Sequence, residues 1–125
     1  MKVGLDMIEI ERIERTLGRY GRFRERVFTA AERDYCDSKP NPPQHYAARF
    51  AGKEAVGKAL GFGVARAFAW QDVEIVGRPK PTVRLSGRAA AWATRVGARG
   101  IDLSLTHSRG MAAAVCVIAV DDGPR

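Results

Sequence analysis

The chain has 125 residues, of which 46% are hydrophobic and 28% are charged, as in an ordinary globular domain. Lys and Arg outnumber Asp and Glu by 21 to 14, so the net charge is +7 and the pI is about 10.0. This balance favours a polyanionic partner, such as a nucleic acid, an acidic protein or a phosphorylated small molecule. A solvated basic surface explains the same charge, so composition leaves the class of partner open. At this length we expect one domain spanning residues 1–125.

The sequence also predicts where the protein is found. Asp6, Glu9 and Glu11 stand where a secretory signal peptide needs an apolar segment. The longest apolar run, residues 111–120, is too short to span a bilayer and suits a buried strand. The cysteines lie far apart, without metal-binding or redox spacing. We therefore expect a cytoplasmic protein with reduced cysteines and no membrane partner.

Taken in chain order, hydrophobic periodicity predicts short strands mixed with helices. Residues 3–7 alternate like a strand, and the period changes at residue 8, where apolar side chains follow helical spacing. The run 29–32 fits a capping box that opens a short helix. The remaining patterns predict a loop at 39–43, a helix at 45–60, strands at 72–76 and 82–85, a helix at 87–96, and strands at 101–106 and 111–120. This order predicts an α+β fold with a largely antiparallel sheet packed against helices.

The helix at 45–60 carries charges where a purely structural helix does not need them. At about 100° per residue, Glu54 and Lys58 fall on the same face as three alanines, Ala47, Ala51 and Ala55. Apolar residues on the opposite face indicate that the helix is buried, and buried charges are costly unless they are paired or bind a metal. Small neighbours around a carboxylate and an ammonium leave room for a ligand. This helix is therefore the first candidate for a functional site.

A second carboxylate, Asp6, lies near the predicted junction between the first strand and the first helix. If folding brings Asp6 to Glu54, the two carboxylates suit Mg²⁺, which binds through one or two carboxylates plus substrate phosphates. Two structural interpretations stay open from the residues alone. Asp6 could cap the helix that follows it, and Glu54 could pair with Lys58 one turn along the helix.

His107 stands where the strand at 101–106 meets a turn at 108–110. A histidine at this point could bind a phosphate or assist proton transfer. It could equally serve as an ordinary turn residue, and the pattern by itself leaves both interpretations open.

Arginines crowd the first predicted helix and the segment that follows it. They alternate with apolar side chains such as Leu17, Tyr20 and Phe23, which makes a basic surface with apolar anchors. Such a surface suits an acidic helical partner, and a solvated basic face is the alternative. The arginines of this segment are Arg12, Arg15, Arg19, Arg22, Arg24 and Arg26.

Four blocks of the chain resemble a known family, the holo-[acyl-carrier-protein] synthases. This family is the small bacterial-type class of 4′-phosphopantetheinyl transferase. The most specific blocks are a Gly-x-Asp signature at 4–6 and a Lys-Glu-Ala-x-x-Lys-Ala helix at 53–59. The blocks at 28–32 and 103–108 occur in the same order and spacing, so the resemblance covers residues 3–120.

The resemblance implies the 4′-phosphopantetheinyl transferase fold and a specific reaction. The phosphopantetheine arm of coenzyme A is transferred to a serine of apo-acyl carrier protein, with release of adenosine 3′,5′-bisphosphate. By the same resemblance Asp6 and Glu54 bind Mg²⁺, while Lys58, Gly61 and His107 contact coenzyme A. Asp6, Glu54 and Lys58 are then the catalytic residues, with Glu54 or a water on the metal accepting the serine proton.

The resemblance also implies homotrimers with active sites between neighbouring subunits. Acyl carrier proteins are acidic and helical, which matches docking onto Arg12, Arg15, Arg19 and Arg22. Nucleic acid is not an expected partner, because the chain shows no nucleic-acid-binding signature. The residues leave open whether the carriers serve fatty-acid or polyketide synthesis.

Overall fold

The computed structural model describes residues 1–61, 69–77 and 80–121. Its elements confirm the predicted α+β fold with antiparallel sheets. In chain order they are β1 (Lys2–Glu9), α1 (Ile10–Arg19), α2 (Phe23–Val27), α3 (Ala30–Asp37), α4 (Pro42–Leu60), the 3₁₀ helix η1 (Trp70–Asp72), β2 (Val73–Val76), β3 (Thr82–Leu85), α6 (Gly87–Arg95), β4 (Ala98–Ser108) and β5 (Met111–Val120). Across these described ranges, no helix combines the length and the apolar character needed to cross a membrane.

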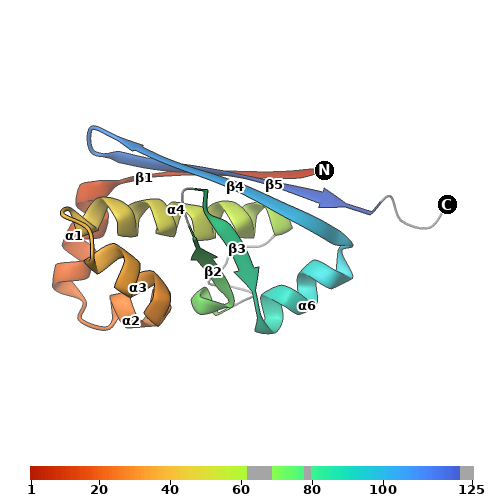
Figure 1. Cartoon of the computed structure of the whole chain (residues 1–125), viewed down its shortest axis with the longest axis horizontal. Helices are drawn as coiled ribbons and strands as arrows, with labels where there is room; N and C mark the ends of the chain where they lie inside the picture. Colours follow the sequence, from red (N-terminus) through yellow and green to blue (C-terminus); the bar gives the residue numbers. More distant parts are fainter. Residues whose placement is uncertain (62–68, 78–79, 122–125) are drawn as a thin grey trace.

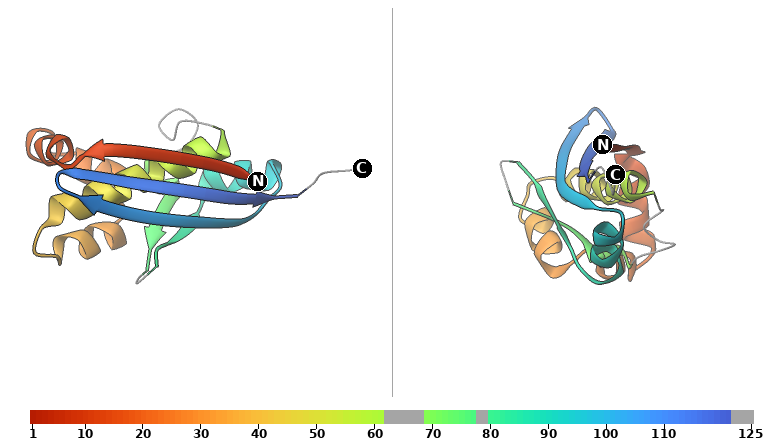
Figure 2. Two further views of the ribbon diagram at one scale, coloured as in Figure 1. Left: turned by 90° about the horizontal axis from the view of Figure 1, so that it is seen from above. Right: turned by 90° about the vertical axis from the view of Figure 1, so that its right-hand side faces the viewer.

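The larger sheet has three strands in the order β1-β5-β4, with both neighbouring pairs antiparallel. The helix α4 runs beneath this sheet, and the β2–β3 hairpin lies on the other side of α4 (Figure 1). Figure 2 shows the three long strands side by side above α4. Because α4 is covered on two sides, both its alanine face and the opposite face with Val56 and Leu60 are buried, as predicted.

Gly4 allows β1 to approach α4 until the two backbones touch. A methyl group at Gly4 would overlap the carbonyl oxygen of Ala55 and lie 2.7 Å from the backbone nitrogen of Ala59. Side chains alternate along a strand, so Asp6 lies on the same face of β1 as Gly4. The close approach therefore holds Asp6 against the last turns of α4.

Several predicted boundaries were wrong. The strand β1 continues to Glu9, so α1 begins at Ile10 rather than at residue 8, and β4 begins at Ala98 rather than at residue 101. The helix α4 begins at Pro42 rather than at His45, so Pro42 and Pro43 belong to its first turn instead of the preceding loop. Proline is tolerated there because the first amides of a helix have no partner within it. At the other end α4 finishes at Leu60, the predicted last residue, and Gly61 ends the helix in the left-handed conformation with a φ of 95°.

The capping box at Thr29 is confirmed, but its glutamate has a second role. The Glu32 carboxylate accepts a hydrogen bond from the Thr29 amide at 2.9 Å, and the Thr29 hydroxyl accepts one from the Glu32 amide at 3.2 Å. The same buried carboxylate forms an ion pair with Lys53 of α4 at 2.8 Å. In the sequence the capping pattern was a sufficient explanation for Glu32, and no ion pair between Glu32 and Lys53 was predicted.

Replacing Gly4 with Ala should destabilise the fold by about 1–3 kcal/mol, the usual cost of forcing extra volume into a packed site. The new methyl group would meet backbone atoms of α4, which cannot rotate away as a side chain can. Gly18→Ala is the control, because Gly18 lies in α1 with open space around it and Ala is the better helix former. Denaturant unfolding measures both changes. A Gly4→Ala protein as stable as the wild type would contradict the close contact.

Candidate active site

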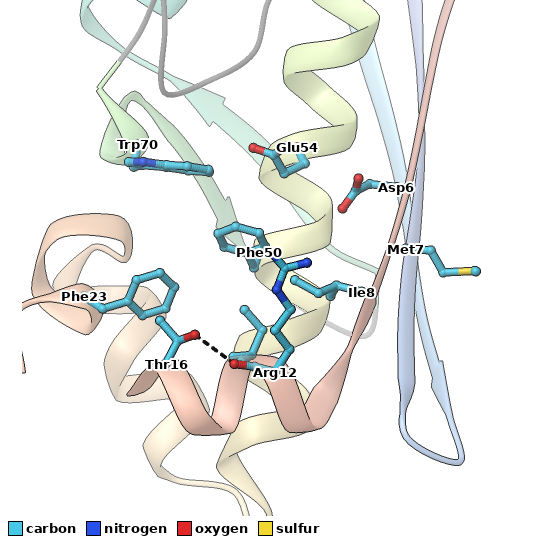
Figure 3. Close-up of a pocket in the computed structure, with 10 residues that line it drawn as sticks. Asp6, Met7, Ile8, Arg12, Thr16, Phe23, Phe50, Glu54 and Trp70 are labelled. Atoms are coloured by element: carbon cyan, nitrogen blue, oxygen red, sulfur yellow. Dashed lines mark hydrogen bonds between the residues drawn. The ribbon is translucent and has the colours of Figure 1, made fainter. Parts of the chain in front are cut away.

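Asp6 and Glu54, which are remote in sequence, line one cleft between β1, α1 and α4. The cleft has a volume of about 460 Å³, and Arg12, Phe50 and Trp70 also line it. In Figure 3 the Asp6 side chain points from β1 toward α4, and Arg12 reaches up from α1. The fold thus brings the two predicted carboxylates to the same cavity.

Lys58 pairs across to β1. Its Nζ donates to Asp6 Oδ1 at 2.9 Å and to the Leu5 carbonyl oxygen at 3.0 Å. The Lys58 side chain is 51% exposed and that of Asp6 only 16%, so the ammonium is open to a ligand while the carboxylate is mostly covered. Gly61, one turn later, caps the same helix with its amide bonded to the Lys58 carbonyl oxygen at 3.1 Å.

Neither structural interpretation left open by the sequence describes these residues. The N-cap residue of α1 is Glu9 and not Asp6. The hydrogen bonds of Lys58 run to Leu5 and Asp6 on β1 rather than along α4 to Glu54. Both carboxylates line the cleft, and Asp6 is paired there with Lys58 through Oδ1.

The environment of Glu54 disfavours its charged form. Partial burial raises the pKa of Glu54 above its ordinary value, and the nearby Asp6 carboxylate raises it further, while Lys58 acts in the opposite direction. A carboxylate in such surroundings accepts a proton or a cation more readily than an exposed glutamate does. The site therefore suits either a divalent cation between the carboxylates or proton transfer at Glu54.

The donor set fits Mg²⁺. In the part of the chain that the structure describes, no group of three or more His, Cys, Asp or Glu side chains could hold a metal ion. A cation in the cleft would therefore take two protein carboxylates and complete its shell with water or substrate oxygens. That is the usual pattern for Mg²⁺, whereas structural zinc sites take four protein ligands.

His107 lies in a different cavity from Asp6 and Glu54. Its ring centroid is 5.9 Å from that of His45, and both histidines line a space of about 170 Å³. His107 belongs to β4, whereas Asp6 belongs to β1 at the opposite edge of the sheet. Within one chain, the fold does not bring His107 to the two carboxylates.

Arg49 is a candidate binding residue in the His107 cavity that the sequence analysis missed. Arg49 is only 4% exposed, and its guanidinium carbon lies 3.8 Å from the centroid of the Tyr35 ring. Its Nε has no hydrogen-bond partner among the residues that the structure describes. A buried guanidinium with an unused donor beside two histidines suits an anionic group. Its signal in the sequence was its position one turn before the matched Lys-Glu-Ala-x-x-Lys-Ala block at 53–59.

The predicted docking arginines fall into separate groups. Arg12 lines the cleft with Asp6 and Glu54. Arg15 pairs with Glu11 at 3.7 Å on an exposed face of α1. The turn after α1 carries a basic and aromatic surface cavity of about 500 Å³, lined by Arg19, Tyr20, Gly21, Arg22, Phe23 and Arg26.

Comparisons with known proteins agree with this geometry. Residues 2–116 match the family model of the 4′-phosphopantetheinyl transferase superfamily. The chain is 46% identical to the holo-[acyl-carrier-protein] synthase of Ruminiclostridium cellulolyticum, over 98% of this chain and 94% of that protein. The crystal structure of Helicobacter pylori holo-[acyl-carrier-protein] synthase in complex with coenzyme A superposes with a TM-score of 0.81 at 30% identity, covering 94% of this chain and 99% of that one. The Neisseria meningitidis synthase gives a TM-score of 0.85 at 26% identity, covering 94% and 97%.

The chain therefore belongs to the 4′-phosphopantetheinyl transferase superfamily, and it is an enzyme of that class. Its similarity to curated relatives extends over nearly its whole length, at 46% identity for the R. cellulolyticum protein and for that of Moorella thermoacetica. Within the superfamily it is a member of the holo-[acyl-carrier-protein] synthase family. Family membership, which was predicted from four sequence blocks, is therefore confirmed.

Replacing Glu54 with Gln should stabilise the metal-free protein at high pH only. The folded-state pKa of Glu54 is raised, so the folded protein holds this proton more tightly than the unfolded chain does. The stability contributed by Glu54 is then complete below its unfolded pKa and is lost as pH rises through the folded pKa. Denaturant unfolding with a chelator present should therefore show a more stable variant at about pH 8 and no difference at about pH 3.

Glu14→Gln, at an exposed position of α1, is the matched control and should change little at either pH. The prediction would be contradicted if Glu54→Gln raised the free energy of unfolding equally at both pH values, or lowered it at the higher pH. Either result would show that the surroundings of Glu54 do not raise its pKa.

Proposed function

We propose that this protein transfers the 4′-phosphopantetheine arm of coenzyme A to a serine of apo-acyl carrier protein. Mg²⁺ is the cofactor and adenosine 3′,5′-bisphosphate is the second product. The observation that carries this proposal is the meeting of Asp6 and Glu54 at one cleft, with Lys58 paired to Asp6, in a chain of the synthase family. A relative of similar structure was solved with coenzyme A bound. The nucleophile comes from the carrier, so the chain needs none of its own.

The residues of the cleft position and neutralise charge, which is what phosphoryl transfer mainly requires. Mg²⁺ held by Asp6 and Glu54 would offset the negative charge of the diphosphate of coenzyme A and of the departing bisphosphate. Lys58 adds a half-exposed ammonium beside Asp6, placed to contact phosphate oxygens. The stacked rings of Phe50 and Trp70, with centroids 5.1 Å apart, line the same cleft and limit the water in it.

In the reaction step one phosphoryl group and one proton move. The serine oxygen of the carrier forms a bond to the phosphorus that bears the pantetheine, and the bond from that phosphorus to the departing bisphosphate breaks. The serine proton passes to Glu54 or to a water molecule in the cleft.

The active site is completed in a homotrimer. The outer face of the sheet leaves Val3 and Leu5 63% exposed and Met7 66% exposed, an apolar patch typical of an interaction surface. The strands β1 and β4 are opposite edges of this sheet, so a head-to-tail ring brings the Asp6 edge of one subunit near the His107 edge of the next. His107 and Arg49 of the neighbouring subunit then supply positive groups for the phosphates of coenzyme A.

Carrier docking takes place on the basic surface around α1. The cavity lined by Arg19 and Arg22 combines positive charge with the rings of Tyr20 and Phe23, a combination suited to an acidic amphipathic helix. Arg15 extends the same exposed surface, whereas Arg12 lies in the cleft where the carrier serine must arrive.

Incubation of the protein with coenzyme A, Mg²⁺ and an apo-carrier protein should add the mass of phosphopantetheine to the carrier. Asp6→Asn and Glu54→Gln should each lower kcat by about 10²-fold or more, because each removes electrostatic stabilisation of the transition state. Mg²⁺ should raise the Tm of the wild type but of neither variant, which gives a readout independent of turnover. Folded variants that keep full activity would remove this site assignment.

Reversing the charge at Arg22 should weaken the binding of the carrier protein without affecting the binding of coenzyme A. Arg22→Glu should raise KM for the carrier protein by about tenfold and leave KM for coenzyme A unchanged, since charges at the rim of an interface steer the encounter. Arg99→Glu is the control, because Arg99 lies at the far end of the sheet, where it pairs with Asp121. Equal increases in both KM values would contradict docking at this surface.

Mixed oligomers test whether the site is shared. Asp6→Asn and His107→Ala subunits, mixed after dissociation and reassembly, should recover activity that neither variant has alone, because some shared sites then contain both native residues. Light scattering should give the mass of a trimer. Activity equal to the average of the two separate variants would rule out a shared site.

A further inference from the structure

The buried ion pair between Glu32 and Lys53 takes no part in the proposed chemistry, yet it lies directly behind the cleft. The Lys53 Nζ lies 2.8 Å from Glu32 Oε1, donates to the Trp70 carbonyl oxygen at 3.2 Å, and also donates to the Val73 carbonyl oxygen. Both side chains are fully buried. The three hydrogens of the ammonium thus have three acceptors, as a buried charge requires.

This pair joins four elements of the fold. Glu32 belongs to α3, Lys53 to α4 and Trp70 to η1. The second carboxylate oxygen of Glu32 accepts the amide hydrogen of Ile75, in β2, at 2.8 Å. The charged pair therefore links the segment from η1 into β2 to both α3 and α4.

The contacts of Lys53 lie next to residues that line the cleft. Trp70 stacks on Phe50 with centroids 5.1 Å apart and planes inclined by 27° (Figure 3). Phe50, Glu54 and Trp70 all line the cleft, and Lys53 directly precedes Glu54 on α4. The Lys53 ammonium thus restrains both the rotation of α4 about its axis and the position of the Trp70 backbone.

Stability alone does not account for such a pair. Replacing both members of a buried ion pair by uncharged side chains of similar volume is often neutral or stabilising, whereas removing one member costs about 3–5 kcal/mol. Both charges are fully buried, so each is held in the fold at a desolvation cost. A role in placement explains why both charges are present.

We propose that Glu32 and Lys53 are positioning residues for the transferase reaction. They hold Trp70 against Phe50 and fix the direction from which Glu54 faces the cleft. The kinetic part of this inference rests on the proposed function, and the structural part does not.

The test uses a Trp92→Phe protein, in which Trp70 is the remaining tryptophan. Glu32→Gln and Lys53→Met are then introduced together, so that no unpaired charge is left. We expect a folded variant with a similar Tm, in which acrylamide quenching of Trp70 fluorescence increases by about twofold or more because the segment opens locally. Its kcat should fall by about 10²-fold, as for a misplacement of about 1 Å. KM for coenzyme A should change little.

Arg99→Gln combined with Asp121→Asn is the matched control, an exposed ion pair of 2.9 Å that should alter neither quenching nor kcat. Unchanged quenching in a folded Glu32→Gln/Lys53→Met protein would overturn the inference. If this variant and a second one, Glu32→Met with Lys53→Met, both fail to fold, the pair serves stability and the inference is also overturned. Quenching needs no turnover, so a wild-type protein that fails to modify a carrier would refute the proposed function and leave this test valid.

Discussion

The candidate active site depends on the contact between β1 and α4 at Gly4. The two backbones approach so closely that no side chain fits between them. This spacing lets the Asp6 carboxylate reach Lys58 at 2.9 Å and share a cleft with Glu54. A larger residue at this position would push the strand outward and separate the carboxylates. The small side chains of α4 serve the same packing, because the helix is covered by the sheet on one side and by the β2–β3 hairpin on the other (Figure 1).

Four charged residues of α4 face four different surroundings. Arg49 lines the cavity that contains His107, Lys53 is buried against η1 and β2, Glu54 lines the cleft, and Lys58 pairs with β1. Successive residues of a helix point about 100° apart, so one buried helix can supply charges to separate sites. This arrangement explains why a helix with so many charges is nevertheless at the centre of the fold.

Within one chain, the candidate cation site and the candidate phosphate site are separate cavities. The cleft holds Asp6 and Glu54, whereas Arg49 with its unused donor lies in the cavity shared with His45 and His107. An acidic site that binds a cation and a basic site that binds phosphate would neutralise each other if they were adjacent without a ligand. Their separation within one chain avoids this, and the homotrimer proposed above would bring them together around the substrate.

The sequence by itself determined the order of the elements, most of their ends and the family, because periodicity, capping residues and helix-ending glycines act over a few neighbouring residues. Helical spacing and a strand–helix junction marked Glu54, Lys58 and Asp6 as candidates, and the matched blocks gave them roles. The start of α4 was missed because proline is compatible with both a loop and a first helical turn. Only the tertiary structure decided that Lys58 pairs with Asp6, that Lys53 pairs with Glu32, and that His107 lies apart from the carboxylates. Each of these facts concerns residues far apart in the chain. Local patterns carry no information about which distant charges meet once the backbone has folded.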